Sequence, residues 1–589
     1  MVLSIRLCHQ PMLHIVGRPS VQGNWPTNAG FTTVSRSRWG SDPGNGAAPM
    51  QVQLGAAWTI GPMQAGFLKR GTLRHLEFRG LWAGGSVYFV GNAMQTMAAA
   101  WMMVELSGSS FLAALVQTAV FLPMFLFSLP AGVLADITDR RRLILLALAV
   151  QAAAGVLLAT LSLTQVVGPG GVLLLIFVAG SCTALMSPAW NSTVADSIPR
   201  AELPQAIIAT SVSYNGARAL GPAVAGLVFS YVGGSWNFAL AVISTLVMMQ
   251  SIRRWPPKPH PPSRLPAERL WGGMLSALRF AWHSHSVLAQ LLRAAAYSGA
   301  GSALWALLPV IGQRQLGLDA SGFGLMMGCM GIGAVFSGLL IGRMRVRFGL
   351  EALVTAGCLS YALVMLIAAF SRWHFPVYLA LVVGGGAWMS VMSTFNTATQ
   401  TSVPPWVRAR AVAMHTLAAL GAFAFGSAFW GALSDLAGLP VALCVAAACM
   451  AAGPLMARRF PLRMGEARDV TPATPSLQDL FLGKEPDPGD GPIAVEMAYR
   501  IEAASADDFL SAISQLRAPR RRDGATFWRV YRDLADPQRY LERFIVTSWA
   551  DYLHQRARAT MADHELESHV RSFLIPGQTV TMQHYIAER

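Results

Sequence analysis

The sequence is poor in charged residues, with 13% Asp, Glu, Lys and Arg against 53% hydrophobic residues. Soluble globular proteins carry roughly 25% charged residues. This deficit excludes an ordinary soluble protein and predicts a membrane protein. Residues 493–589 nevertheless hold as many Arg as Asp plus Glu, so the net charge of +15 arises before them. A balanced, charge-rich tail after an apolar, basic body predicts a separate soluble domain.

Several sequence motifs typical of metal, disulfide or nucleotide-binding sites are also missing. The six cysteines form no C-x-x-C pair, which favours buried thiols over a metal or disulfide role. No G-x-x-x-x-G-K-[ST] loop occurs, which argues against direct coupling to ATP. We therefore expect no cofactor, no metal, no catalytic residue and no nucleic-acid partner.

Residues 1–75 lack the 7 to 15 residue apolar core of a secretory signal. They are rich in Gly, Ser, Pro, Arg and Asn, with Asp42 as their only acidic residue. We interpret them as a disordered extension or a start codon assigned too early. A transit-like leader is the alternative, because such leaders are rich in Arg and Ser and poor in acids.

Between about residues 81 and 457 the chain is a succession of apolar runs, each close to the ~20 residues that a membrane-spanning helix needs. A lone strand would leave its backbone groups unsatisfied in lipid, so we predict helices. The twelve runs lie near 81–104, 111–134, 143–165, 171–192, 205–230, 236–252, 287–312, 322–342, 351–370, 375–397, 409–432 and 438–457.

The basic residues of the connecting loops predict the orientation. They gather in the loops of one side, whereas the other side offers only Arg314 and Arg372. Because cytoplasmic loops carry the excess of Lys and Arg, both ends of the membrane body are expected in the cytoplasm.

The body contains an internal echo. Gly216, Gly221 and Gly226 recur as Gly421, Gly426 and Gly431, each 205 positions later. A gapless echo indicates two homologous halves, and a Pro-rich linker near 255–266 divides the runs six plus six. An amphipathic segment at 269–285 follows this linker and is expected at the membrane interface. The predicted divisions are 1–75 (extension), 76–253 (first half), 254–286 (linker with amphipathic helix), 287–460 (second half), 461–492 (linker) and 493–589 (soluble domain).

The tail shows strand and helix patterns in the order β-α-β-β-α-β, which is typical of a ferredoxin-like α+β domain. The expected strands are 494–503, 526–534, 540–548 and 578–587, and the expected helices are 506–516 and 549–573.

This organisation resembles the major facilitator superfamily of secondary transporters. The loop after the second run, A-G-V-L-A-D-I-T-D-R-R-R, is similar to the superfamily signature G-x-x-x-D-R-x-G-R-R. Gly132, Asp136, Arg140 and Arg141 match it, whereas Ile137 and Asp139 depart from it. The second copy keeps Gly338 and Arg347 but has Gly342 in place of the acid. In the family this loop holds the halves together on the cytoplasmic side and gates the switch.

The stretch from Gly216 to Gly226 resembles the fifth-helix signature of exporters, G-x-x-x-x-G-P-x-x-x-G. With its soluble tail, the chain is most similar to the branch called transmembrane secretion effectors, which includes siderophore and macrolide exporters. The resemblance implies export of a small organic molecule across a bacterial inner membrane, by alternating access and proton antiport.

Arg218 is a functional candidate because a charge at the centre of a membrane helix costs at least ~2.5 kcal/mol unless it faces a cavity or a partner. A structural salt bridge is the alternative. The glycines and Pro222 favour close packing and a bend. Our gating set is Gly132, Asp136, Arg140, Arg141, Gly216, Arg218, Gly221, Pro222 and Gly226.

Superfamily cavities are lined by the first, fourth, seventh and tenth helices, and the resemblance therefore implies a set of cavity residues. This set is Asn92, Gln95, Trp101, Tyr297, Trp305, Trp388 and Asn396. Ordinary interhelical hydrogen bonding explains each of them equally well. Proton coupling needs a titrating group, and the candidates are Glu105, Asp136, His415 and Asp435; an interfacial role is the alternative for each.

One further function stays open. The tail is similar to small ferredoxin-like domains of the antibiotic-biosynthesis monooxygenase type, although it carries no diagnostic motif. The alternative hypothesis is therefore a membrane-tethered, cofactor-free monooxygenase whose transporter body moves its substrate or product. Self-association through the tail is also left open.

Overall fold

A computed structural model of the chain describes residues 72–256, 278–465, 470–471 and 486–588. Most of the proposed N-terminal extension, the Pro-rich linker and most of the linker before the tail lie outside these residues. The expected amphipathic segment at 269–285 is described only from residue 278, and helical structure is present at 278–283.

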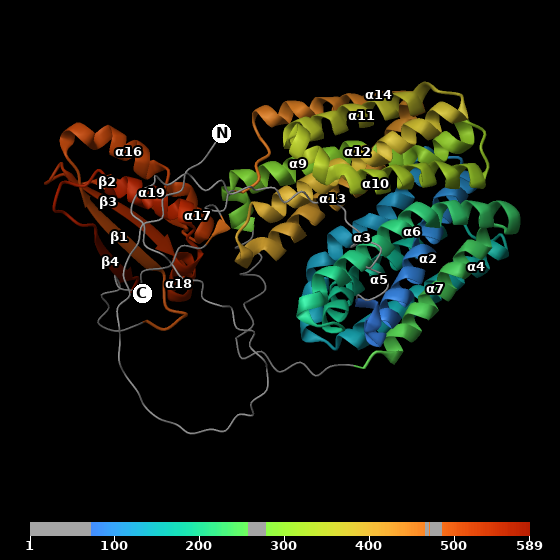
Figure 1. The fold of residues 1–589 in the computed structure, drawn as a ribbon, viewed down its shortest axis with the longest axis horizontal. Coiled ribbons are helices and arrows are strands. Elements are labelled where there is room, and N and C mark those ends of the chain that lie inside the picture. Colours follow the sequence, from blue (N-terminus) through green and yellow to red (C-terminus); the bar gives the residue numbers. More distant parts are fainter. Residues whose placement is uncertain (1–71, 257–277, 466–469, 472–485, 589) are drawn as a thin grey trace, which may run out of the picture. The chain divides into compact units, whose positions relative to one another are not determined.

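The body is formed by long helices in two sets (Figure 1). The first set precedes residue 257 and consists of α2 (Leu76–Ser107), α3 (Ser110–Ile137), α4 (Arg140–Leu163), α5 (Pro169–Asp196), α6 (Leu203–Val232) and α7 (Gly234–Arg254). The second set follows residue 277 and consists of α9 (His285–Val310), α10 (Ala320–Phe348), α11 (Leu350–Phe370), α12 (His374–Thr401), α13 (Pro405–Ala437) and α14 (Leu439–Ala452). They are flanked by short 3-10 helices at Thr72–Arg74, Arg200–Glu202 and Gly453–Arg458 and by a short π-helix at Ile311–Gln315.

Local sequence signals explain where several helices begin. Ser109, Asp139 and Asp319 each accept a hydrogen bond from a backbone N–H of the following first turn, which satisfies a donor that the helix leaves open. Gly233 and Gly438 join consecutive helices with positive φ, a conformation that glycine adopts without strain.

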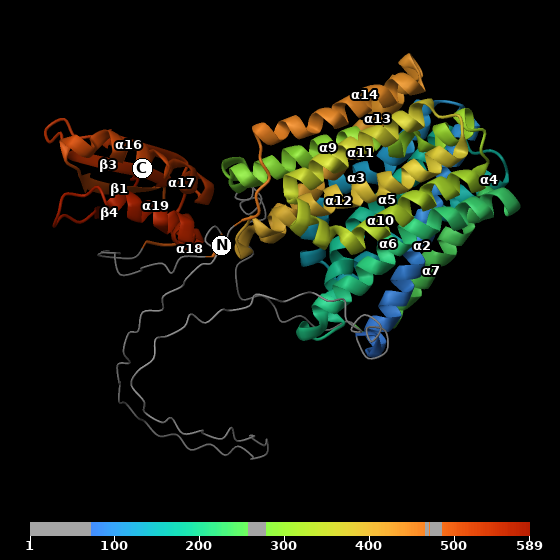
Figure 2. The ribbon, with the colours of Figure 1, turned by 45° about the horizontal axis from the view of Figure 1, so that its top comes forward.

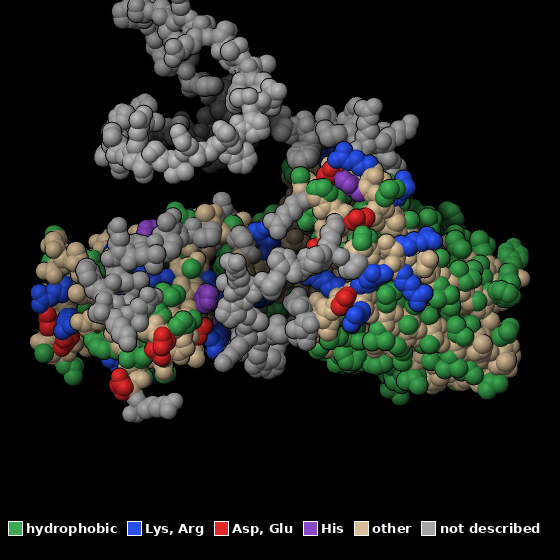
Figure 3. Space-filling view, turned by 90° about the horizontal axis from the view of Figure 1, so that it is seen from below, with side chains coloured by type: hydrophobic (Ala, Val, Ile, Leu, Met, Phe, Trp, Pro, Cys, Tyr) green, Lys and Arg blue, Asp and Glu red, His purple; other side chains and the backbone are tan. Residues whose placement is uncertain are grey.

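Ten of the described helices are long and apolar enough to cross a membrane. The first helix α2 and the Arg-bearing helix α6 are as long but are not among the ten. Both carry several polar residues along their length, which lowers their hydropathy. The outer surface of the helical body is covered largely by hydrophobic side chains (Figure 3), as expected for a surface that faces lipid.

The two sets pack in the same pattern. In the first set α2 packs against α6, α3 against α5 and α4 against α7. In the second set α9 packs against α13, α10 against α12 and α11 against α14. The most extensive contacts between the sets are those of α3 with α13 and α6 with α10, and both pairs can be followed in Figures 1 and 2.

The tail contains a four-stranded antiparallel sheet in the order β2-β3-β1-β4. Its strands are β1 (Ile493–Arg500), β2 (Phe527–Arg532), β3 (Arg539–Val546) and β4 (Thr581–Ile586), and its helices are α16 (Ala506–Ser514), α17 (Arg517–Asp523), α18 (Trp549–Arg558) and α19 (Met561–Arg571). Apolar side chains of the helices and sheet form one core, with Phe509, Trp549 and Tyr552 almost fully buried.

Two expectations about the tail were wrong in detail. The single helix predicted at 549–573 is two helices, because Thr560 starts α19 with a capping box that it shares with Asp563. The Arg-rich helix α17, which follows α16 directly, was not predicted.

Candidate functional site

The glycines of α6 mark where this helix touches its neighbours. A Cβ atom on Gly221 would lie 2.7 Å from the side chain of Ala93 in α2. A Cβ atom on Gly226 would lie 2.5 Å from the carbonyl oxygen of Ala320, where α10 begins. Of the residues that the structure describes, none lies within 4 Å of that position on Gly216. Two of the three glycines therefore allow close packing of backbones, as small residues do between membrane helices.

Two of the corresponding glycines of α13, Gly426 and Gly431, also lie at close contacts between helices. A Cβ atom on Gly431 would meet Ala114 and the backbone of Ser110, where α3 begins, and one on Gly426 would meet Gly299 of α9. Each set thus contributes one glycine-bearing helix that packs against the start of a helix in the other set.

Asp435 strengthens the contact between α13 and α3. Its carboxylate accepts hydrogen bonds from the backbone N–H groups of Ser110 (2.7 Å) and Phe111 (3.1 Å) and from the hydroxyl of Ser109. An acid at the start of a helix satisfies open backbone donors and complements the positive end of the helix dipole. Asp435 therefore caps a helix that belongs to the other set.

A related polar contact joins α6 and α10. Ser230 donates a hydrogen bond to Asp319 (3.1 Å) and accepts one from the backbone N–H of Ser321 (3.0 Å). The N–H of Gly322 and the hydroxyl of Ser321 hold the pKa of Asp319 below its ordinary value. We call these two contacts, formed by Ser109–Phe111, Ser230, Asp319–Ser321 and Asp435, the closed end.

Aromatic side chains gather between helices of the second set. The rings of Tyr297 and Trp388 have centroids 5.4 Å apart, and Trp305 lies 6.3 Å from Trp388. The hydroxyl of Tyr297 is buried and has no hydrogen-bond partner among the described residues. The structure therefore brings together three of the predicted cavity residues. Around them lie Tyr361, Phe395 and Phe423, which were not predicted.

Arg218 reaches this aromatic cluster from the other set. Its guanidinium carbon lies 5.5 Å from the centroid of Trp305 and 6.0 Å from that of Tyr214, which are cation–π distances. The Arg218 side chain is exposed in the structure. Its position supplies a positive charge beside a group of aromatic faces, contributed across the junction of the two sets.

The other predicted cavity residues are not in this cluster. Trp101 stacks on Phe323, with centroids 5.4 Å apart, and donates a hydrogen bond to Glu105 (2.7 Å). Asn396 accepts a hydrogen bond from Gln400. Two others lie on α2: Asn92 is half-buried and Gln95 is buried.

The residues of the predicted gating loop lie in helices: Gly132 and Asp136 in the last turns of α3, and Arg140 and Arg141 at the start of α4. Arg140 forms an ion pair with Asp196 of α5 (2.8 Å), and Arg141 donates to the backbone carbonyl of Arg253. Both contacts stay within the first set. Nothing within 4 Å would meet a Cβ atom on Gly132, and the side chain of Asp136 lies outside the described residues.

His415 is the remaining proton-coupling candidate. It is buried in α13, and its Nδ1 atom lies 3.4 Å from the hydroxyl of Thr399 in α12. This contact is confined to the second set.

Sequence reasoning missed a buried ion pair. Arg293 of α9 is almost fully buried and contacts Glu351 of α11 at 2.7 Å. The same carboxylate accepts the backbone N–H of Leu462, and Arg293 donates to the carbonyl of Phe460. An arginine inside an apolar run was the signal that could have identified this pair.

A second missed cation is Arg345, near the end of α10. Its guanidinium donates to the hydroxyls of Ser393, Thr394 and Thr397 of α12 at 3.0 to 3.1 Å. The repeated Ser and Thr residues at helical spacing were the available signal.

Within the described residues, no group of three His, Cys, Asp or Glu side chains could hold a metal ion.

Comparison with known proteins places these features in a family. A family described as "Transmembrane secretion effector" matches residues 70–589. The chain is 24% identical over 385 residues to the multidrug efflux pump Tap of Mycolicibacterium fortuitum, an alignment that covers 63% of this chain and 91% of Tap. It is 26% identical over 371 residues to the enterobactin exporter EntS of Salmonella choleraesuis, covering 62% of this chain and 86% of EntS.

Solved structures show the same fold in the membrane body. The nucleoside transporter NupG matches with a TM-score of 0.53 at 15% sequence identity, covering 66% of this chain and all of NupG. This similarity concerns the fold alone.

Proposed function

The chain belongs to the transmembrane secretion effector family, and from this premise we propose that it is a secondary transporter that exports a small organic molecule. The family and its characterised relatives are transporters, not enzymes. Tap is named for multidrug efflux and EntS for enterobactin export. By analogy, a siderophore, a drug or a secondary metabolite is the proposed class of substrate.

The proposed mechanism is alternating access between two six-helix repeats that together make twelve membrane spans. The observation that carries it is the closed end. There Asp435 and Ser230 hold the two sets together through a few hydrogen bonds, beside close glycine contacts. Such a junction is able to separate and reform at modest free-energy cost.

The proposed substrate site is the aromatic cluster of Tyr297, Trp305 and Trp388 with Arg218 beside it. Aromatic faces bind apolar rings, and the guanidinium binds π-faces or an anionic group. Asn92, Gln95, Trp101 and Asn396 remain candidates for other parts of the pathway.

Proton antiport is the proposed energy source. Asp435 and Glu105 lie toward the closed end, and Asp435 participates directly in closing it. Protonation of Asp435 would weaken its caps on α3 and so favour separation of the two sets. Glu105, Asp136 and His415 are the other candidates.

We propose a location in a bacterial inner membrane with both termini in the cytoplasm. The closed end then faces outward, and the Arg-rich start of α4 faces the cytoplasm. Gly132, Asp136, Arg140 and Arg141 are the proposed gate of that cytoplasmic side.

The tail is proposed to be a ferredoxin-like domain, supported by its strand order β2-β3-β1-β4. It remains a candidate for self-association. The alternative of a tethered monooxygenase gains no support from the relatives, which are named as transporters. Purified tail that turned over aromatic substrates would revive it.

A reversible cross-link tests alternating access. Ser230→Cys and Ser321→Cys, in a chain whose six cysteines are replaced by Ser, place two thiols where a hydrogen bond now joins the two sets. We expect oxidation to stop transport and reduction to restore it, while each single variant is insensitive to the oxidant. Transport that continues with the disulfide formed would contradict the mechanism.

Inverted membrane vesicles test export and its coupling. A macrolide and enterobactin serve as substrates, with and without an imposed proton gradient. Accumulation that requires the gradient supports proton antiport, and accumulation of neither compound would contradict this substrate class.

A further inference from the structure

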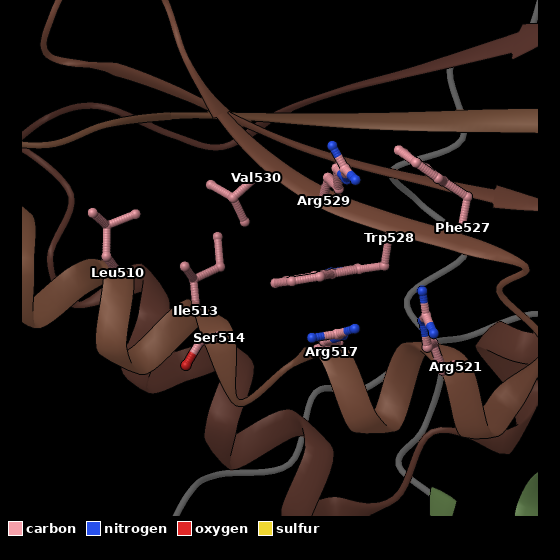
Figure 4. Close-up of a pocket in the computed structure, with 9 residues that line it drawn as sticks. All are labelled: Leu510, Ile513, Ser514, Arg517, Arg521, Phe527, Trp528, Arg529 and Val530. Carbon is pink, nitrogen blue, oxygen red and sulfur yellow. The ribbon is translucent and has the colours of Figure 1, made fainter.

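The tail contains a cavity that the transport proposal does not use. It measures about 510 Å³ and lies between helices α16 and α17 and the strand β2, at the edge of the sheet (Figure 4). This is within the size range of small-molecule sites, ~300 to 1,000 Å³. It is therefore large enough to hold an organic molecule of one or two rings.

Three arginines line this cavity: Arg517 and Arg521 from α17 and Arg529 from β2. Among the described residues, none of the three has a carboxylate within ion-pair distance. The Nε atom of Arg521 is buried and has no hydrogen-bond partner in the described part of the chain. A buried donor without a partner costs free energy unless a ligand or water satisfies it.

Two other arginines of α17 are paired with acidic residues, in contrast to Arg517 and Arg521. Arg520 pairs with Glu542 (3.1 Å) and Glu567 (2.7 Å), and Arg522 pairs with Asp523 and Asp563. Burial alone would lower the pKa of Arg520, but its two carboxylates raise it overall. The acids of the domain thus neutralise the inward arginines and leave the cavity with an excess of positive charge.

The apolar wall of the cavity is also fixed in place. The indole of Trp528 donates a hydrogen bond to the buried carboxylate of Glu542 (2.9 Å) and lies across the cavity, as Figure 4 shows. Ile513 of α16 and Val530 of β2 face it on one side, and Arg517 lies on the other. A flat ring could stack on the indole while its anionic group meets the guanidinium groups.

We propose that this cavity is a binding site for a planar organic anion, in which Trp528 contacts the ring and Arg517 and Arg521 bind a carboxylate or similar acidic group. Arginine suits this task because its planar fork of donors matches a carboxylate. The site would give the tail a ligand-binding role that is separate from the path through the membrane.

The test measures binding of 1-naphthoate to the full-length protein in nanodiscs of zwitterionic lipid, by equilibrium dialysis against empty nanodiscs. We expect saturable binding that weakens at least about tenfold in the Arg517→Gln, Arg521→Gln double variant, because two charge-assisted hydrogen bonds are lost. The Lys replacements at both positions should retain most of the affinity.

A matched control keeps the result interpretable. Arg532→Gln with Arg571→Gln makes the same charge change on exposed arginines of the same domain that do not line the cavity, and should leave binding unchanged. Neutral 1-naphthamide should bind more weakly than naphthoate, and acetate should not compete.

Three results would overturn the proposal: equal binding by the double variant, equal binding of naphthamide, or displacement of naphthoate by phosphatidylglycerol in the nanodisc. The last result would assign the site to a lipid headgroup. Because the readout is binding, failure of the export proposal would not affect it.

Discussion

The helices α6 and α13 are related by sequence, and the structure shows what they share and what they do not. Both carry three glycines at the same spacing. Gly226 lies against the start of α10, and Gly431, its echo, lies against the start of α3. This shared pair of glycines therefore lies where one set of helices touches the other.

The unshared positions carry the chemistry. Arg218 of α6 lies over Trp305, whereas its echo Phe423 packs against Trp388 at 5.9 Å and belongs to the aromatic cluster itself. Ser230 of α6 and its echo Asp435 both reach across to the other set, but only Asp435 carries a charge. The glycine pair at the junction is shared by the two helices, and the differences at single positions make the proposed site asymmetric.

The largest expected effect comes from filling a shared glycine. Gly226→Leu places a side chain against the backbone of α10, and overpacking of this kind costs about 2 kcal/mol. We expect the closed arrangement to be disfavoured roughly thirtyfold and export in vesicles to fall strongly. Gly431→Leu should do the same at the other junction.

The control for this prediction is Gly216→Leu. Since no residue in the described part of the chain lies within 4 Å of its Cβ position, it should leave export within about twofold of the parent. An equal loss in all three variants would mean that glycine at these positions does not act through packing between the sets.

The second prediction distinguishes the roles of Arg218 and Phe423, which occupy corresponding positions in α6 and α13 at the aromatic cluster. Arg218→Ala removes the cation beside Trp305, and we expect export to fall about tenfold while the amount of protein in the membrane is unchanged. Arg218→Lys should recover part of the activity, and Phe423→Ala should lower the amount of folded protein instead. Transport measured per molecule of inserted protein distinguishes these outcomes.

The last turns of α3 and α10 offer a third comparison, because only α3 carries an acid at the signature position. We expect Asp136→Asn to slow export several-fold without preventing membrane insertion, and Gly342→Asn in α10 to have no such effect. Transport rate and immunoblot of membranes measure both. Normal transport by Asp136→Asn would refute the gating assignment.

The smallest effect contrasts the two polar contacts of the closed end. Asp435→Ala removes a cap on α3 and should cost about 1 kcal/mol. Ser230→Ala removes one hydrogen bond to the carboxylate of Asp319, which keeps its bonds from Ser321 and Gly322, and one from the backbone of Ser321, and should cost about 0.5 kcal/mol. Melting temperatures of the purified variants should fall in that order, and the reverse order would mean that the cap on α3 is not the stronger contact.

The positions of the membrane helices were predictable because each spans an apolar run. The run near 143–165 became α4 (Arg140–Leu163), and the run near 236–252 became α7 (Gly234–Arg254). The partners of these helices were not predictable. Asp435 was recognised as a charged residue near a membrane surface, but nothing local indicates that it caps a helix more than 300 residues earlier.

The candidate site was predictable only in part, for a similar reason. Tyr297, Trp305 and Trp388 were chosen from helices that line superfamily cavities, and they lie together. Trp101, chosen by the same reasoning, instead stacks on Phe323. Rotation of a helix about its axis decides between these outcomes, and it depends on packing that spans both sets. In the tail, the helix break at Thr560 was visible in the capping residues and could have been predicted.

The hydrogen bonds around Leu462 and Arg463 fix the point where the chain leaves the membrane body. From residue 466 to the first strand at Ile493, a fully extended chain covers roughly 90 to 100 Å at most. The Arg-lined cavity of the tail can therefore be no farther from the body than this tether plus the width of the domain. A molecule bound there is confined to a small volume beside the membrane, which raises its effective concentration near the membrane body.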